Sequence, residues 1–109
     1  MTDTTQISLD QPVISATQAE PLFDLGFIVI TPGAQRAIAA SGSRATPYLM
    51  RHASGDWSEM DEVDRKQNSF AVEKALRVFS AYTLGSGKKL WIVTEWDRSV
   101  TTLLMPAEY

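Results

Sequence analysis

The sequence predicts one small α+β domain, in which a strand and three helices precede an antiparallel meander of three strands. Its 109 residues, 44% hydrophobic and 21% charged, suffice for one hydrophobic core but not for two. The first half holds a short apolar run and two Thr-Pro helix starts. The second half ends in apolar runs separated by glycine-rich or polar turns. Helices and strands are therefore segregated along the chain, which is typical of one small sheet packed by helices.

Residues 1–22 are rich in Thr, Ser, Gln, Asp and Pro, and their apolar residues follow no regular period. We therefore expect a flexible arm, followed by a single folded domain over 23–109. Alternatively, the arm orders on a partner or a second subunit, because residues 12–14 can lie extended against an edge strand.

The apolar, β-branched run at residues 25–30 predicts a buried, central strand. Thr31 and Pro32 follow it as an N-cap and a first-turn proline, so a short alanine-rich helix should run to about Ala40 and close near Gly42.

A second short helix should follow, with Thr46 as its cap, Pro47 in its first turn and Gly55 at its end. A third, longer helix should begin near Ser58, because Ser58 and Asp61 approximate the spacing of a capping box. Helical spacing predicts that its inward face is built from Met60, Val63, Phe70 and Ala71.

The last third predicts three strands joined by short turns. Residues 77–84 and 89–96 are apolar runs separated by the glycine turn 85–87, and a polar turn at 97–99 leads to a third run at 100–105. The expected order is therefore β-α-α-α-β-β-β.

Five carboxylates lie within nine residues, with no basic residue among them. Helix-dipole stabilisation accounts for two or three of them, and the rest would form an acidic surface that attracts a basic partner. The predicted partner-binding residues are Asp56, Trp57, Glu59, Asp61, Glu62 and Asp64. Plain solvation of the carboxylates, and packing of Trp57 as a hydrophobic staple on the third helix, are the alternatives.

The sequence offers little for catalysis or metal binding. His52 is the only histidine and has no second histidine at ligand spacing, while the acidic run lacks the glycine and the final glutamate of a calcium loop. No cysteine is present, and the glycine turn 85–87 leads into a strand, whereas phosphate loops lead into a helix. We expect a structural or solvated His52, no metal, no cofactor and no enzymatic activity.

Charge and segment composition indicate which classes of partner and which cellular location to expect. The net charge of −3 and the scattered basic residues argue against direct nucleic-acid binding. The N-terminus lacks the pattern of a signal peptide, and no apolar run approaches the roughly 20 residues of a membrane span. These features, with the absence of cysteine, predict a cytoplasmic location without membrane contact.

Several motifs follow one another in the domain: RHxSGDW at 51–57, WxxTExDRSxTT at 91–102 and PxEY at 106–109. With them, residues 25–109 resemble an uncharacterised family of small proteobacterial proteins found on plasmids and other mobile elements. The resemblance implies no activity. Members are sometimes described as type I restriction subunits, but this chain has no methyltransferase cofactor motif.

The sequence thus predicts a noncatalytic accessory factor of a mobile genetic element, which binds an unidentified protein through an acidic surface. An anti-defence role, of the anti-restriction or anti-CRISPR kind, fits that description. One alternative is a small RelE-like ribonuclease toxin, although the basic RNA-facing surface of that class is missing. Another is a homodimeric structural module formed by edge pairing of the meander.

Overall fold

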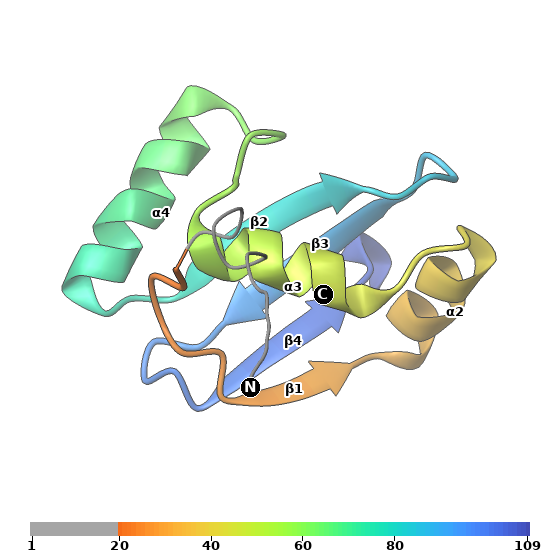
Figure 1. Ribbon diagram of the computed structural model, residues 1–109, viewed down its shortest axis with the longest axis horizontal. Coiled ribbons are helices and arrows are strands. Elements are labelled where there is room, and N and C mark those ends of the chain that lie inside the picture. Colours follow the sequence, from red (N-terminus) through yellow and green to blue (C-terminus); the bar gives the residue numbers. More distant parts are fainter. Residues whose placement is uncertain (1–19) are drawn as a thin grey trace, which may run out of the picture.

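The computed structural model describes residues 20–109, so most of the predicted arm lies outside the described residues. The order of elements is the predicted one, and the α+β class is confirmed (Figure 1). The elements are β1 (Phe27–Ile30), α2 (Pro32–Ala40), α3 (Ala45–Ser54), α4 (Glu62–Lys74), β2 (Val78–Thr83), β3 (Lys89–Thr94), β4 (Val100–Leu104) and the 3₁₀ helix η2 (Pro106–Glu108).

The four strands form one mixed sheet in the order β1-β4-β3-β2. β2, β3 and β4 make the predicted antiparallel meander. β1 pairs with β4 in parallel, with Phe27 opposite Val100 and Ile30 opposite Leu103. The prediction of a buried, central β1 is therefore wrong, because β4 is its only neighbour among the described strands and all four of its residues are exposed.

Gly26 fixes the entry into β1. Its φ of 67° lies in the left-handed region, and a Cβ there would collide with the carbonyl group of Ser99. Only glycine allows this close approach without strain. The next residue, Phe27, then donates its backbone N–H to the Ser99 carbonyl over 2.9 Å, which begins the ladder between β1 and β4.

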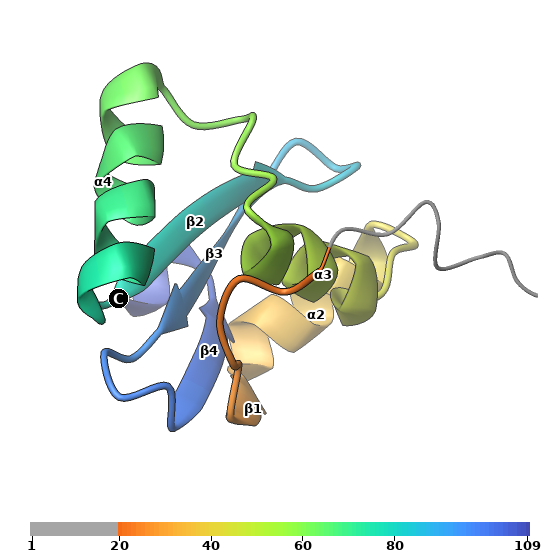
Figure 2. The same ribbon diagram turned by 60° about the vertical axis from the view of Figure 1, so that its left-hand side comes forward.

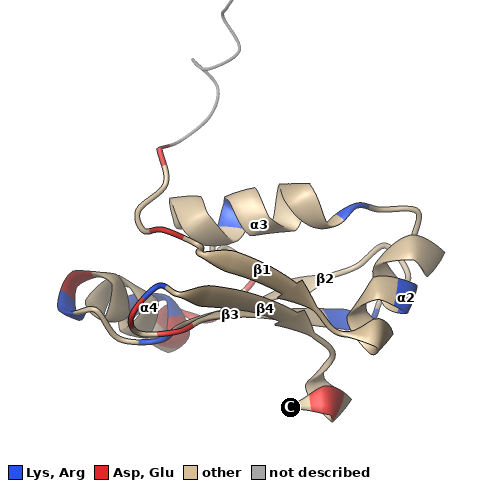
Figure 3. Ribbon diagram, turned by 90° about the horizontal axis from the view of Figure 1, so that it is seen from below, with Lys and Arg blue, Asp and Glu red and all other residues tan. Residues whose placement is uncertain are grey.

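The α-helices of the described chain are divided between one face of the sheet and one edge. α2 and α3 cover one face, η2 lies on the opposite side, and α4 lies beside β2 (Figures 1 to 3). The main core fills the space between α2, α3 and the sheet, and its buried residues are Ala34, Ile38, Tyr82, Leu84, Leu90, Ile92 and Leu103. A smaller core under α4 contains Trp57, Met60, Ala71 and Val78.

Two predicted helix starts are wrong. Thr46 lies inside α3, whose N-cap is Arg44 without a side-chain hydrogen bond. α4 begins at Glu62 and not near Ser58, because Asp61 accepts the Asp64 N–H over 2.9 Å and is the N-cap. Ser58 instead donates its hydroxyl to Asp56 over 2.7 Å.

The later start changes which residues of α4 face inward. Asn68 and Ala71 are its buried residues. Met60 is buried before the helix begins, whereas Val63 is 75% and Phe70 48% exposed. The predicted inward face is therefore correct only at Met60 and Ala71.

Candidate functional site

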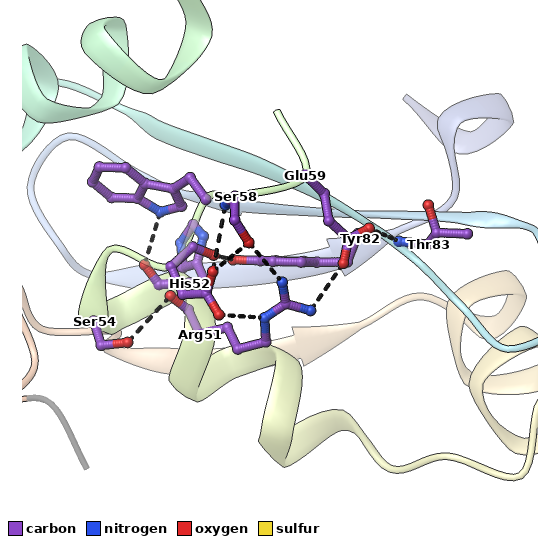
Figure 4. A network of polar contacts seen from close by, with 9 residues as sticks. Arg51, His52, Ser54, Ser58, Glu59, Tyr82 and Thr83 are labelled. Carbon is purple, nitrogen blue, oxygen red and sulfur yellow. Dashed lines mark hydrogen bonds and ion pairs between the residues drawn. The ribbon is translucent and has the colours of Figure 1, made fainter. Parts of the chain in front are cut away.

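The first part of the acidic stretch is neutralised within the chain. Arg51, near the end of α3, contacts Asp56 over 2.8 Å and Glu59 over 2.9 Å. Its guanidinium also lies 4.5 Å from the centre of the Tyr82 ring. The second oxygen of Glu59 accepts the backbone N–H of Thr83 over 2.7 Å (Figure 4). Asp56 and Glu59 thus tie the loop before α4 to α3 and β2.

The electrostatics of this cluster agree with its geometry. Hydrogen bonds from Arg51 and Ser58 lower the pKa of Asp56. Burial acts to raise the pKa of Glu59, but hydrogen bonds from Thr83 and Arg51 outweigh it, so this pKa is also lowered. Both groups are charged near neutral pH, and their charge is directed largely at Arg51.

The remaining carboxylates lie at the start of α4. Asp61 is the N-cap, and Glu62 pairs with Lys66 over 3.3 Å at exposed positions. Figure 3 shows acidic and basic residues interspersed along this helix. Asp64 lies in the first turn of α4, where the helix dipole favours a carboxylate. The acidic stretch is therefore mostly helix capping and internal ion pairing.

Trp57 is a core residue. Its side chain is 5% exposed, and its indole N–H donates to the His52 carbonyl over 3.1 Å. It packs in the small core with Met60, Ala71 and Val78, so its ring offers no surface to a partner. Of the six predicted partner-binding residues, the structure brings Asp56 and Glu59 together on Arg51, and it places the other four separately.

His52 belongs to a buried chain of polar side chains that crosses the sheet. Its Nδ1 contacts the Ser80 hydroxyl and its Nε2 lies 2.8 Å from Thr94 Oγ1. Thr94 Oγ1 is 2.7 Å from Thr101 Oγ1, which donates to the Leu25 carbonyl over 2.7 Å. All four side chains are fully buried.

The carbonyl at the end of this chain determines the direction of its hydrogen bonds as far as Nε2 of His52. Leu25 O can only accept, so Thr101 donates to it and must accept from Thr94. Thr94 then accepts from Nε2–H of His52. Burial, assisted by the charge of Arg98, lowers the pKa of His52 to about 3, so the ring is neutral near pH 7. A neutral ring with its proton on Nε2 has a free lone pair on Nδ1, which accepts from the Ser80 hydroxyl.

The contact between Ser80 and His52 has the residue types of a nucleophile and its base, but not the access. Both side chains are 0% exposed, and Thr94 stands where an orienting carboxylate would bind the imidazole. A substrate cannot reach Ser80 without opening the core. The arrangement joins α3 to β2, β3 and β4.

A surface depression of about 710 Å³ lies between α2 and the C-terminal segment, and its lining includes Arg36, Lys88 and Lys89. Its carboxylate, Glu108, accepts hydrogen bonds from the Thr31 hydroxyl and from the N–H groups of Gly33 and Met105. Glu108 thus holds the start of α2, and these hydrogen bonds, that from Thr31 above all, lower the pKa of its carboxyl group. Within residues 20–109 there is no group of three or more potential metal ligands, and no helix there is long and apolar enough to cross a membrane.

The outer edge of β1 is both apolar and exposed. Phe27 is 83%, Ile28 42%, Val29 46% and Ile30 37% exposed. Phe27 and Thr31 direct their N–H groups to β4, at 2.9 and 3.0 Å from the carbonyls of Ser99 and Leu103. In a parallel ladder alternate residues bond to the same neighbour, so the N–H and C=O groups of Ile28 and Ile30 point outward.

The opposite edge of the sheet is covered at two positions. Asn68 of α4 donates to the Phe79 carbonyl over 2.6 Å and accepts the Phe79 N–H over 3.2 Å, which replaces a neighbouring strand. Glu59 accepts the N–H of Thr83 further along β2. Pairing through the outer edge of the meander, which the sequence allowed, would displace these contacts.

β1 is the strand predicted at residues 25–30, but its position at an exposed edge was not predicted. The signal was present, since no charged residue or edge-protecting proline occurs between Leu25 and Thr31. Comparisons with protein-family models, with curated proteins and with solved structures find no match to this chain.

Proposed function

We propose that this protein is a noncatalytic protein-binding module, and that its partner adds an extended strand to the outer edge of β1. The observation that carries this proposal is the contrast between the two edges of the sheet. Asn68 and Glu59 bond to the outer edge of β2 at Phe79 and Thr83, whereas β1 leaves four apolar side chains and two residues' backbone groups exposed. Strand addition uses such groups for affinity and the alternating side chains for selectivity.

This proposal moves the binding surface away from the acidic stretch, because Asp56, Glu59 and Asp61 are engaged within the chain. A role as an accessory factor of a mobile element rests on the resemblance of residues 25–109. The ribonuclease alternative receives no support from His52, which is buried and neutral.

The test is site-specific crosslinking in the native host. A photoreactive benzophenone amino acid replaces Phe27 on β1 or, as the control, Val63 on α4, which is 75% exposed. We expect a discrete adduct from position 27 only. Ile28→Pro should abolish it, because proline removes an outward N–H that the ladder to β4 does not use.

Circular dichroism must show that the Ile28→Pro protein remains folded. Equal adducts from both positions, or an adduct at position 27 that survives Ile28→Pro, would show that the partner does not pair with this edge.

A further inference from the structure

β1 has the composition of a strand with neighbours on both sides and cover on both faces. Ile28 and Ile30 point to the face that carries α2 and α3, since they are in register with buried Thr101 and Leu103. Phe27 and Val29 point to the opposite face. Apolar side chains on both faces are typical of an internal strand, yet β1 lies at the edge. A second strand would resolve this mismatch.

We infer that this strand is β1 of a second copy of the chain, paired antiparallel about a two-fold axis at Val29. The inference rests on the proposed function and identifies its partner. It joins two four-stranded sheets into one continuous sheet, in which both copies of β1 become internal strands.

The backbone determines the register. Only Ile28 and Ile30 present outward N–H and C=O groups within β1, and in an antiparallel pair the residues of a hydrogen-bonded pair exchange both bonds. Ile28 therefore faces Ile30 of the partner subunit, and the reverse pair follows by symmetry. Val29 then lies opposite Val29 of the partner subunit, on the axis. Gly26 before the strand and Pro32 after it limit the pairing to this segment.

Charge favours a second copy at this place. Each chain has a net charge of −3, so most surfaces of two copies repel each other. Residues 25–35 contain no charged side chain, and Figure 3, which views β1 from its outer side, shows no acidic or basic residue along the strand. Self-pairing here brings no like charges directly opposite each other.

The helix-covered face adds contact area beside the strands. Met50 of α3 is 45% exposed. A depression of about 280 Å³, lined by Ile30, Ile38 and residues of both α2 and α3, opens next to β1. The register places Ile28 of the partner subunit beside Ile30 and hence next to this depression. Because the pairing has two-fold symmetry, each of these contacts forms twice.

Sedimentation equilibrium of the full chain tests the inference. We expect the mass to reach twice that of one chain as the concentration is raised to about 500 µM, a range in which small interfaces are populated. Val29→Lys places two ammonium groups opposite each other, so dissociation should become roughly 100-fold easier, through like-charge repulsion and the lost apolar contact. Val29→Asp should do the same. Val63→Lys, at an exposed position of α4, is the matched control and should leave the mass unchanged.

The decisive arm mixes the Val29→Lys and Val29→Asp proteins. Opposite charges then meet at the axis, so the equimolar mixture should regain the double mass although each protein alone is a monomer, and added salt should weaken this recovery. A dimer that persists in both single variants, or a mixture that stays monomeric, would overturn the axis at Val29.

The failure of this inference is distinguishable from failure of the proposed function. A wild-type protein that is monomeric throughout the range refutes the second copy. An adduct of position 27 with a different protein would, in that case, still support strand addition at β1. No adduct at position 27 with any chain would refute both.

Discussion

The neutral, buried His52 predicts a specific loss of stability on mild acidification. Its pKa is about 3 in the folded protein and near the ordinary 6.5 in the unfolded chain. Between these values the unfolded chain binds a proton that the folded protein does not, so unfolding becomes more favourable as the pH falls. The contribution of His52 is complete above about pH 6.5 and is lost progressively toward pH 3.

The magnitude follows from the linkage relation. Lowering the pH from about 7 to about 5 should reduce the free energy of unfolding by about 2 kcal/mol, since one pKa unit corresponds to about 1.4 kcal/mol. His52 is the only histidine. The lowered pKa values of Asp56 and Glu59 affect stability mainly below this window. The effect measured there therefore belongs to His52.

The assay is urea denaturation at the two pH values. With a urea dependence of about 1–2 kcal/mol per molar, the midpoint should fall by about 1–2 M. His52→Gln should be less stable at both pH values, because it disturbs the bonds to Ser80 and Thr94, and should show little change between them. A wild-type midpoint that is the same at pH 7 and pH 5 would refute the argument, as would NMR titration of the ring above pH 5.

Two further predictions concern α4. Asn68→Ala should lower the free energy of unfolding by about 1–3 kcal/mol, because two backbone groups of Phe79 lose their partner. Ser69→Ala, on the exposed side of α4, is the control and should lower it by less than about 0.5 kcal/mol. Equal losses in chemical denaturation would contradict the role of Asn68 in covering the sheet edge. Asp61→Ala should lower the free energy of unfolding by about 0.5–2 kcal/mol through loss of the N-cap, whereas Asp64→Asn should lower it by a few tenths. A larger effect at Asp64 in thermal unfolding would show that Asp61 is not the N-cap.

The predicted partner-binding residues were inferred from their neighbours in the sequence, whereas their contacts in the fold come from other segments. Sequence alone displays five carboxylates without an interspersed basic residue. The cation that compensates two of them, Arg51, precedes the stretch and reaches it only because α3 ends at Gly55, with a left-handed φ of 88°, and the chain turns back. In the sequence, Trp57 is likewise an aromatic residue of a loop, and only the packing of α4 over it makes it a core residue.

The sequence by itself determined the order of the elements, because each depends on local chemistry: Thr31 and Pro32 start α2, Gly55 ends α3, and alternating apolar runs form the meander. Only the tertiary structure decided the polar chain through His52, the covering of β2 by Asn68 and the position of β1 at the edge. These depend on contacts between distant segments, whose pairing is set by how the sheet and helices pack together. The pattern of a strand indicates which of its faces are apolar, but the packing of the whole fold determines which strands lie beside it.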